Sequence, residues 1–390
     1  MRRDWRVIVV GLGGIGSGAA YWLARRFGPD VLGLEQFELG HTNGASQDHS
    51  RIIRYSYHTP AYVRLAFGAY DAWRAVEAEA GEALVIRTGG LDLWPPGAAI
   101  PMADYRSSLA AVGVPFEAFD EHEVMRRWPV FRLEPGTQAI FQADGGIAAA
   151  ARGNAAHQRL AREHGATLLE RQRVAAVVPQ ADGTVVVELA DGSSLQAQDV
   201  VMATDAWTAD LLRPLGVDLP LTVTQEQVTY FACPDPALFA PERFPVWIWM
   251  DDPSFYGFPV FGEAGPKVAQ DVGGRAVTAA TRDFAPDEAA AARVRDFLAR
   301  HLPAALGPPI RTRTCLYTLT PDRDFVVDHV PGAPHVLVML GAAHAFKFAS
   351  HLGRVAAELV ADGRTTADLA AFRLDRPILR EVHPATNFMV

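Results

Sequence analysis

A glycine-rich turn between two short apolar runs dominates the start of the chain. Residues 7–10 and 31–34 are continuous apolar runs, which are typical of strands buried on both faces. Residues 17–26, between them, have the composition of a helix. The turn, Gly11-Leu12-Gly13-Gly14-Ile15-Gly16, follows the first run and opens this helix. The order strand, helix, strand predicts a parallel βαβ unit.

The GxGxxG spacing of this turn favours the binding of a dinucleotide. Gly11 permits the tight turn, Gly13 lets the backbone approach a pyrophosphate, and Gly16 lets the helix pack closely on the strand. Glu35 follows the second run, 19 residues after Gly16, where a carboxylate can accept hydrogen bonds from an adenosine ribose. A carboxylate disfavours the 2′-phosphate of NADP, so NAD and FAD remain as candidates.

The composition is that of a globular protein that handles small molecules. Of the 390 residues, 49% are hydrophobic and 21% are charged, and this length predicts two packed domains. A net charge of −9 without a run of Lys and Arg argues against nucleic acid as a partner. No segment has the ~20 apolar residues of a membrane helix, and the start of the chain leaves no room for a signal peptide. We expect a cytoplasmic protein, and no metal site is predicted.

The rest of the chain alternates helical and strand patterns. Helices are expected at residues 62–80, 147–165, 285–302 and 343–363. Strands are expected at residues 84–94, 166–179, 184–204 and 336–342, with a hairpin signal at Asp191-Gly192. Residues 218–280 are rich in aromatic residues and prolines, which predicts an antiparallel sheet forming one wall of a binding site.

Five motifs occur in an order that resembles a known family. They are GLGGIG with Glu35, SRIIRY at 50–55, FYGFP at 255–259 with Lys267 beyond it, TCLYTLTPDRDFVVD at 314–328, and HAFKF at 344–348. Over nearly the whole chain, this set resembles the monomeric sarcosine oxidase and N-methyltryptophan oxidase family of flavoenzymes. The resemblance implies an α/β fold of mixed α+β character, with a Rossmann-like FAD-binding domain and a second, mixed-sheet substrate domain. The FAD-binding domain would comprise residues 1–85, 145–217 and 318–390, and the substrate domain residues 86–144 and 218–317.

The activity that this resemblance implies is oxidation of an N-methyl or cyclic secondary amino acid. FAD would take a hydride equivalent from the C–N unit, O2 would be reduced to H2O2, and the imine would hydrolyse in water. We expect a monomer whose partners are the amino-acid substrate and O2. Two alternatives stay open. One is an FAD-dependent dehydrogenase or biosynthetic tailoring enzyme acting on an unusual imino acid, and the other is an NAD-binding or catalytically silent module on the same fold.

Cys315 is one of only two cysteines, and Arg311 and Arg313 precede it. In the family that the chain resembles, the matching cysteine is bonded through sulfur to the 8α carbon of FAD. A free cysteine is more commonly a small buried hydrophobe, which is our interpretation of Cys233. For Cys315, the two arginines can favour the thiolate, which is the nucleophile that flavinylation requires. We therefore expect covalent FAD at Cys315.

The resemblance matches three side chains to the binding of the substrate carboxylate. Arg54 and Lys347 would fix it by charge-assisted hydrogen bonds, and Tyr256 would donate another. Most arginines and lysines are solvated surface charges, but Lys347 lies between Phe346 and Phe348, just after a buried strand. Tyr256 could instead be an aromatic residue of the core whose hydroxyl is hydrogen-bonded within the protein.

Two further cations are matched to positions beside the flavin. Lys267 would stabilise the superoxide-like anion formed during oxygen reduction, and Arg51 would be a second cationic neighbour of the ring. The substrate amine must lose its proton before oxidation. His344 could assist, or the cations could depress the amine pKa by like-charge repulsion. The family's cofactor contacts map to Gly11, Gly13, Ile15, Gly16, Glu35, Ser46, Ser50, Arg51, Val174, Cys315, Gly341 and Lys347.

Departures from the family pattern bear on the substrate. The family's SGHGFK is AAHAFK here, so that Ala343 and Ala345 replace glycines and would narrow the pocket or shift the ring. Asp271 stands where sarcosine-oxidising members carry histidine, which could favour a substrate with a basic side group or simply face solvent. Asp205, in MATDAW, replaces a glycine and puts a backbone contact to FAD in doubt.

Overall fold

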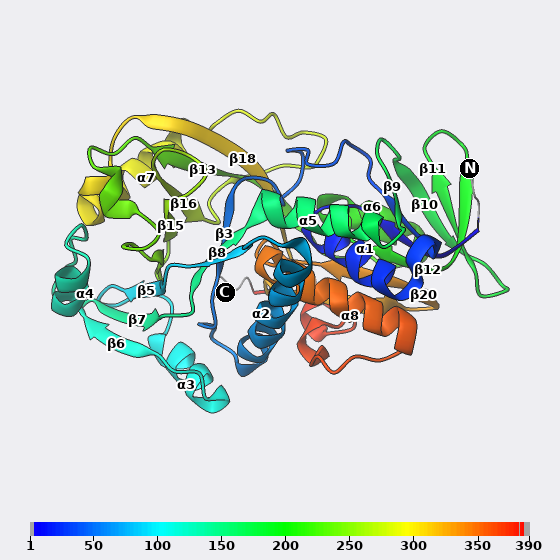
Figure 1. Ribbon diagram of the computed structural model, residues 1–390, viewed down its shortest axis with the longest axis horizontal. Helices are drawn as coiled ribbons and strands as arrows, with labels where there is room; N and C mark the ends of the chain where they lie inside the picture. The colour runs from blue at the N-terminus through cyan, green and yellow to red at the C-terminus, as the bar shows by residue number, and fades with distance from the viewer. Residues whose placement is uncertain (1–3, 382, 386–390) are drawn as a thin grey trace.

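The computed structural model describes residues 4–381 and 383–385. Its helices and strands form two lobes that lie side by side in Figure 1. Each lobe is built on one large mixed sheet, so the expected mixed α/β fold class is confirmed. Residues 1–3, 382 and 386–390 of the expected FAD-binding segments lie outside the described residues.

The first lobe is built on an eight-stranded sheet with the order β10-β11-β12-β1-β2-β9, in which β20 pairs with β12 and β19 with β20. Its strands are β1 (Asp4–Val10), β2 (Val31–Leu34), β9 (Thr167–Leu169), β10 (Val174–Pro179), β11 (Val185–Leu189), β12 (Ser194–Met202), β19 (Val326–Val330) and β20 (Ala333–Leu340). Strand β1 pairs in parallel with both β2 and β12, as the predicted βαβ unit requires. The hairpin predicted at Asp191-Gly192 joins β11 to β12.

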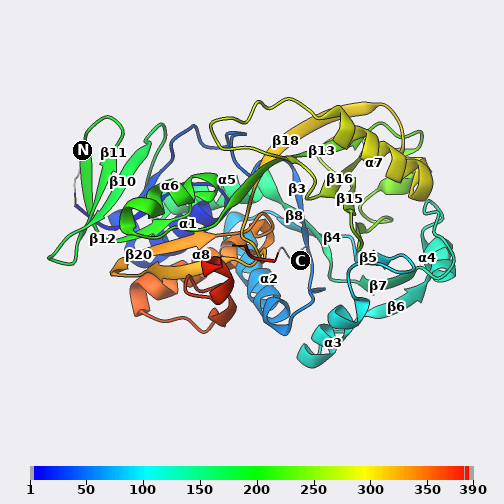
Figure 2. The ribbon, with the colours of Figure 1, turned by 180° about the vertical axis from the view of Figure 1, so that it is seen from behind.

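This sheet is buried on both faces, and alternate residues of β1 serve the two faces. Val7 and Val9 belong to one hydrophobic cluster, which includes Leu352 of helix α8 (Ala349–Asp362). Ile8 and Val10 belong to a second cluster on the other face. Helix α1 (Gly14–Phe27) packs against both α8 and α5 (Ala150–Glu163) in this lobe, which Figure 2 shows from behind. The continuous apolar run is therefore explained by burial on both sides.

The second lobe is built on a nine-stranded sheet with the order β17-β13-β16-β15-β14-β5-β7-β6, in which β18 also pairs with β13. Its strands are β5 (Gly90–Trp94), β6 (Glu117–Asp120), β7 (Gln138–Gln142), β13 (Thr222–Phe231), β14 (Val246–Trp249), β15 (Ser254–Val260), β16 (Pro266–Asp271), β17 (Arg275–Ala276) and β18 (Pro309–Leu319). Strands β13 to β17 pair antiparallel, as predicted, while β14 pairs in parallel with β5.

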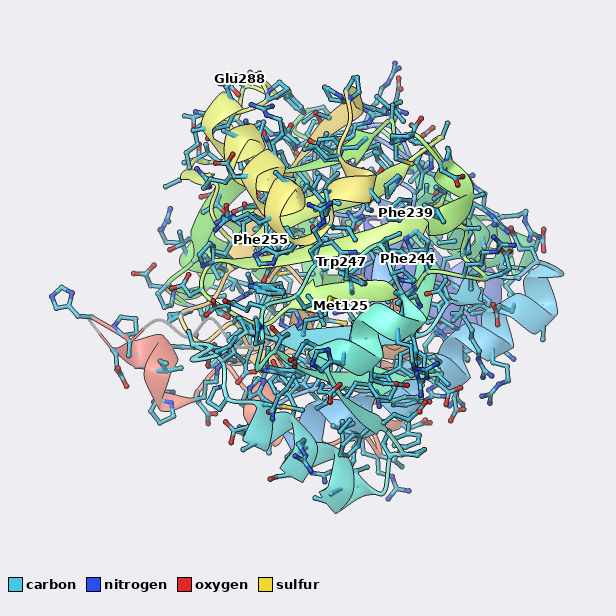
Figure 3. The ribbon with its side chains drawn as sticks, turned by 90° about the vertical axis from the view of Figure 1, so that its left-hand side faces the viewer. Met125, Phe239, Phe244, Trp247, Phe255 and Glu288 are labelled. Carbon is cyan, nitrogen blue, oxygen red and sulfur yellow. The ribbon has the colours of Figure 1, made fainter. Side chains whose placement is uncertain are left out.

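Aromatic side chains fill the core of this second lobe. The ring of Phe297, from helix α7 (Glu288–His301), stacks on Trp247 at 5.5 Å and on Phe255 at 4.3 Å between ring centroids. Phe239 and Phe244 make an edge contact in the same core. Figure 3 looks onto this core from the end of the molecule, with α7 above it and helix α4 (Glu121–Arg127) below.

A small three-stranded sheet, β3-β8-β4, lies between the lobes in Figure 1. It consists of β3 (Ser50–Ile53), β4 (Val85–Arg87) and β8 (Gly146–Ala149), and helix α2 (Pro60–Ala80) follows β3 in the chain. The helix predicted from residue 147 begins only at Ala150, because residues 146–149 pair with β3 and β4. The closing helix predicted from residue 343 begins at Ala349, since Ala342 and Ala343 have positive φ and Phe346–Phe348 forms a 3₁₀ turn.

Two remaining helices complete the architecture around the sheets. They are α3 (Met102–Val112) in the second lobe and α6 (Thr208–Leu212) in the first. Among the described residues, no helix is long and apolar enough to cross a membrane. The domain boundaries stated above stay a prediction.

Candidate active site

The glycine-rich turn adopts the geometry that its sequence predicts. Gly11 has a φ of 86°, and its N–H donates to the carbonyl of Leu34 at 2.8 Å. A Cβ on Gly16 would lie 1.8 Å from the carbonyl oxygen of Gly11, so only glycine lets the start of α1 approach the strand this closely. The N–H of Gly14 donates to Ser46 Oγ at 2.8 Å, which holds the loop after β2 against the turn.

Glu35 lies beside this turn, with its side chain buried. One carboxylate oxygen accepts from the N–H of Leu12 at 2.9 Å and the other from the N–H of Phe37 at 3.0 Å. Burial alone would raise the pKa of Glu35, but hydrogen bonds from His41 and from the two backbone N–H groups lower it. Glu35 therefore stays ionised, and its oxygens retain lone pairs for further donors.

A cavity of about 690 Å³ is lined by residues of both lobes. The sequence-predicted residues that line it are Gly11, Gly13, Ile15, Glu35, Ser46, Arg51, Arg54, Val174, Tyr256, Gly341, His344 and Lys347. Four other predicted residues are described but do not line it, namely Gly16, Ser50, Lys267 and Cys315. The cavity therefore brings the glycine-rich turn and Lys347, more than 300 residues apart in sequence, into one site with Arg54 and Tyr256.

Lys267 is buried, and its ammonium is held by two oxygens. Its Nζ donates to Asp48 Oδ2 at 2.9 Å and to the carbonyl of Ser50 at 2.8 Å. Burial lowers the pKa of Lys267 to about 8, although the Asp48 carboxylate raises it. The ammonium also lies 4.1 Å from the ring centroid of Phe258, which lines the cavity. The Lys267 ammonium is thus separated from the cavity by the ring of Phe258.

Arg51 fixes the loop that precedes β3. Its guanidinium donates to the carbonyls of Ala45 at 2.8 Å, Gln47 at 2.7 Å and Ser50 at 2.7 Å. Burial alone would lower the pKa of Arg51, but Asp48 raises it. These bonds hold the Arg51 guanidinium in one position, and the residue lines the cavity. Its positive charge is therefore fixed beside the site.

Arg54 forms a buried ion pair with Asp92. The guanidinium donates to Asp92 Oδ1 at 3.0 Å, and both side chains are 5% exposed. Asp92 lies on β5, so that this pair connects the end of the small sheet to the nine-stranded sheet. Burial would lower the pKa of Arg54, but Asp92 raises it, and the arginine stays charged.

Lys347 differs from the other cations because its ammonium has no carboxylate partner among the described residues. The side chain is buried, and Nζ lies 5.5 Å from the ring centroid of Tyr57. Burial lowers the pKa of Lys347 to about 7, and Arg54 lowers it further. An anion that binds in the cavity can therefore pair with this ammonium.

Two tyrosines lie together in the wall of the cavity. The hydroxyls of Tyr256 on β15 and Tyr317 on β18 are 3.5 Å apart. Burial raises the pKa of both phenols. They are neutral hydrogen-bond donors near pH 7.

Asp271 lines the cavity with one carboxylate oxygen paired to an arginine, and its effect on the choice of substrate stays a prediction. It accepts from Arg323 at 2.9 Å, and both residues line the cavity. His344 Nε2 donates to the carbonyl of Arg323 at 2.8 Å, which leaves Nδ1 as the bare nitrogen of a neutral ring. Burial holds the pKa of His344 well below its usual value, and Lys347 lowers it further.

The chain matches the family model "DAO: FAD dependent oxidoreductase" over residues 6–359. It belongs to this family. Monomeric sarcosine oxidase from Bacillus sp. (strain NS-129) is 31% identical over 386 residues, which cover 98% of this chain and 99% of that protein. N-methyl-L-tryptophan oxidase from Escherichia coli O9:H4 (strain HS) is 29% identical over 377 residues, which cover 95% and 98%.

A solved structure supports the same assignment for this DAO family member. The open form of NikD, an unusual amino acid oxidase essential for nikkomycin biosynthesis, has a TM-score of 0.84 and 27% identity, covering 98% of this chain and 100% of that one. The expected family and enzyme class are confirmed: the chain is an FAD-dependent oxidoreductase acting on CH–NH groups. The turn, where added Cβ atoms would fill the backbone cradle, and the ionised Glu35 fit FAD.

Cys315 is buried in this DAO family member, and one of the two arginines expected to favour its thiolate pairs with another group. Arg311 instead donates to Glu263 at 2.5 Å. Burial raises the pKa of Cys315 to about 11, and the cations that lower this pKa are Arg51 and Arg282. Two of the cations that act on the thiol therefore come from segments distant in the chain.

Two of the three residues that replace a glycine of the family pattern have backbone conformations that favour glycine. Ala343 has a φ of 72° and Asp205 a φ of 45°, both in the left-handed region. Ala345 has a φ of −84°, which suits any residue. Burial raises the pKa of Asp205 to about 6. At Ala343 and Asp205 the backbone therefore keeps a conformation that suits glycine and is strained for the residue present.

Four charged residues of the site escaped the sequence analysis: Asp48, Asp92, Arg282 and Arg323. Asp92 carried a signal, because an acid inside the apolar strand GLDLW requires a partner. Arg282 donates to the carbonyl of Thr314 at 2.8 Å, a contact between a loop and strand β18 that no local pattern predicts.

Proposed function

We propose that this chain is a flavin-dependent oxidase of a secondary amino acid, either N-methyl or cyclic. The bound FAD would accept a hydride equivalent from the C–N unit and pass two electrons to O2, which leaves as H2O2. The resulting imine would take up water and split into a carbonyl compound and an amine. The names of the relatives, sarcosine oxidase and N-methyl-L-tryptophan oxidase, favour substrates of this kind.

The observation that carries the proposal is the Lys347 ammonium, which is buried in the cavity wall without a carboxylate partner in the described chain. A buried charge is costly unless it is paired, so an anionic ligand in the cavity would stabilise this ammonium. The substrate carboxylate meets this requirement. Arg54 lies near enough to lower the pKa of Lys347 and adds a second cation for the same carboxylate, while Tyr256 supplies a hydroxyl donor.

The same cations account for deprotonation of the substrate amine. A protonated amine held beside Lys347 and Arg54 experiences like-charge repulsion, which lowers its pKa and favours the neutral form with its lone pair. His344 keeps a bare Nδ1 in the cavity wall, but burial and these cations make its ring a weak base. We assign the main effect to the cations, and we assign His344 to the positioning of the Arg323 carbonyl.

The wall near these groups accommodates an apolar part of the substrate. Ile100, Ile248 and Met250 line the same cavity, and Ile248 lies directly opposite Tyr256 across β14 and β15. A cyclic or branched carbon skeleton can pack against them while its carboxylate pairs with Lys347.

A peroxide-coupled screen of the purified protein tests the proposal. The substrates are sarcosine, N-methyl amino acids, proline, pipecolate and fructosyl amino acids, assayed in air. H2O2 formed in proportion to substrate consumed supports an oxidase. Reduction of an artificial electron acceptor without peroxide would instead indicate the dehydrogenase or tailoring alternative. Absence of turnover with every one of these amines would contradict the proposal.

We also propose that the chain acts as a monomer in the cytoplasm. Light scattering is expected to give one species near the chain mass of 42.3 kDa. A dimer mass would contradict the first part, and recovery of the native protein in an exported fraction would contradict the second.

A further inference from the structure

Asp271 and Arg323 form an ion pair in the wall of the cavity. Arg323 Nη1 lies 2.9 Å from Asp271 Oδ2, and the two side chains are 5% and 23% exposed, respectively. Asp271 ends β16 opposite Ser254 of β15, whereas Arg323 comes from the loop between β18 and β19. All three residues line the cavity. The pair is therefore assembled from two remote segments at the site itself.

The loop that carries Arg323 is held on both sides. Arg323 has a φ of 58°, which costs a residue other than glycine about 1 kcal/mol. On the inner side its carbonyl accepts from His344. On the outer side Arg376 donates to both oxygens of Asp322, at 2.7 and 2.9 Å, and to the carbonyl of Phe325 at 2.8 Å. These contacts hold the backbone of the loop from which the Arg323 side chain enters the cavity wall.

The pair also determines the charge around Lys347. The charged groups that act on the Lys347 ammonium are Arg54, Asp92, Arg323 and Asp271. These four residues form two ion pairs. Lys347 is then the one uncompensated charge of this set of five residues, and a single substrate carboxylate neutralises it.

The cavity also presents the phenols of Tyr256 and Tyr317 and the apolar side chains of Ile248 and Met250. Arg51 and Arg313 line the cavity as well, but they are not among the charges that act on Lys347. A second charge on a substrate side chain beside Lys347 would have to disrupt one of the two ion pairs to find a partner there. Disruption of a buried pair costs several kcal/mol.

We propose, on the basis of the proposed function, that the Asp271–Arg323 ion pair determines substrate specificity. Held together, the two residues keep the wall neutral, and the enzyme selects secondary amino acids with one carboxylate and an uncharged side chain. Without the Asp271 charge, Arg323 attracts a second carboxylate. Without the Arg323 charge, Asp271 attracts a basic side chain.

The test measures the dissociation constant of each probe from the FAD-loaded enzyme without oxygen, taken from the dependence of the rate of flavin reduction on the concentration of the probe. The probes are N-methyl-L-leucine, N-methyl-L-glutamate and N-methyl-L-lysine, which differ in side-chain charge. The wild type is expected to prefer the leucine derivative. D271N is expected to shift the preference about tenfold toward the glutamate derivative, and R323M about tenfold toward the lysine derivative. The double variant D271N/R323M is expected to prefer the leucine derivative again.

Glu263→Gln is the matched control, because Glu263 pairs with Arg311 at 2.5 Å in the same lobe and neither residue lines the cavity. This variant is expected to leave the three affinities in their wild-type ratio. If R323M does not fold, the affinity ratios of D271N test the specificity role without it, since asparagine preserves the shape of the aspartate side chain. Wild-type ratios in D271N overturn the specificity role. If no probe changes the wild-type flavin spectrum, the proposed function fails, and the specificity role with it.

Discussion

Arg376 donates two hydrogen bonds to the carboxylate of Asp322, at 2.7 and 2.9 Å. Asp322 directly precedes Arg323, whose side chain lines the cavity. The side chains of Arg376 and Asp322 are only 10% and 13% exposed. The segment that contains Arg376 thus holds the loop from which Arg323 reaches the cavity.

Replacement of Arg376 by Gln should release this loop. We expect the free energy of unfolding to fall by about 3 kcal/mol, because a nearly buried pair is broken. We also expect KM to rise more than kcat falls, because Arg323 is no longer held in place. Arg373→Gln, which breaks an exposed pair with Asp375 in the same segment, should change stability by less than about 1 kcal/mol. Equal effects of both variants in denaturant titrations and steady-state kinetics would contradict this role.

Binding of a carboxylate should weaken as pH rises through the pKa of Lys347, which is about 7 in the free protein. The ammonium is present below this pH and lost above it, so affinity for an unreactive monocarboxylate should be flat below pH 7. Above pH 7 it should fall, by at most about tenfold per pH unit. Titrations followed by flavin absorbance between pH 6 and 9 measure this. Lys347→Met should bind weakly at every pH, and a retained slope would assign the titration to another group.

Lys347 should also make stability depend on pH. Its pKa of about 7 in the folded protein lies below the value of 10.5 for a free lysine. Between these values the unfolded chain binds more protons, and stability therefore rises with pH across that window. Lys347→Met should remove this contribution and raise the melting temperature at pH 7. A lower melting temperature than wild type would show that the buried ammonium has a stabilising partner.

Lys267→Met should slow the reaction of the reduced flavin with oxygen by about 100-fold, since a fixed cation near the site is lost. Reduction of the flavin by substrate should change much less, because Lys267 lies behind the wall, on Asp48 and Ser50. Stopped-flow measurements of the two half-reactions separate these effects. An unchanged rate with oxygen would remove Lys267 from the oxidative step.

Cys315→Ser should abolish retention of yellow colour in acid-precipitated protein, whereas Cys233→Ser should not. The proposed bond joins Cys315 Sγ to the 8α carbon of FAD. It replaces the thiol hydrogen and one methyl hydrogen, and the two electrons leave on O2 as H2O2. Because burial raises the pKa of Cys315 to about 11, Arg282→Gln should slow attachment by removing a cation that lowers this pKa. Wild-type protein that loses its colour in acid would refute the bond.

Ala343→Gly should stabilise the fold by about 1 kcal/mol, because Ala343 has a φ of 72°. Ala345→Gly, two residues away at a φ of −84°, should destabilise it by about 0.5–1 kcal/mol through the greater freedom of the unfolded chain. Melting temperatures of the two variants should therefore move in opposite directions. A shift in the same direction would mean that Cβ packing, rather than backbone strain, dominates at these positions.

Local patterns were sufficient for much of the fold. The turn at Gly11–Gly16 and the hairpin at Asp191-Gly192 depend on glycine geometry that neighbours in sequence specify, and both were predicted. The strand Gly146–Ala149 was mistaken for the start of a helix, because its pairing with β3 and β4 joins segments far apart in the chain. Long-range pairing, which has no local signature, limited the prediction.

The residues of the site divide in the same way, into those that local motifs predict and those that only the fold brings together. Motif resemblance placed Arg54 and Lys347, and both line the cavity. The acids that pair with the cations, such as Asp92, come from other strands and were missed. The charge near Cys315 was assigned to the adjacent arginines, although Arg51 and Arg282 act on it. Residue type indicates what chemistry is available, whereas the fold decides which charge acts on which atom.

The pairing of β20 with β12 bears on how much of the chain is needed to hold the cofactor. Val336–Val338 complete the sheet beside Val200–Met202, and Gly341 and Lys347 follow them into the cavity wall. A chain that stops before residue 336 lacks this strand and the residues that follow it, Gly341 and Lys347 included. We expect such a chain to carry the glycine-rich turn but not to retain FAD, because the part of the cavity wall that follows β20 is missing.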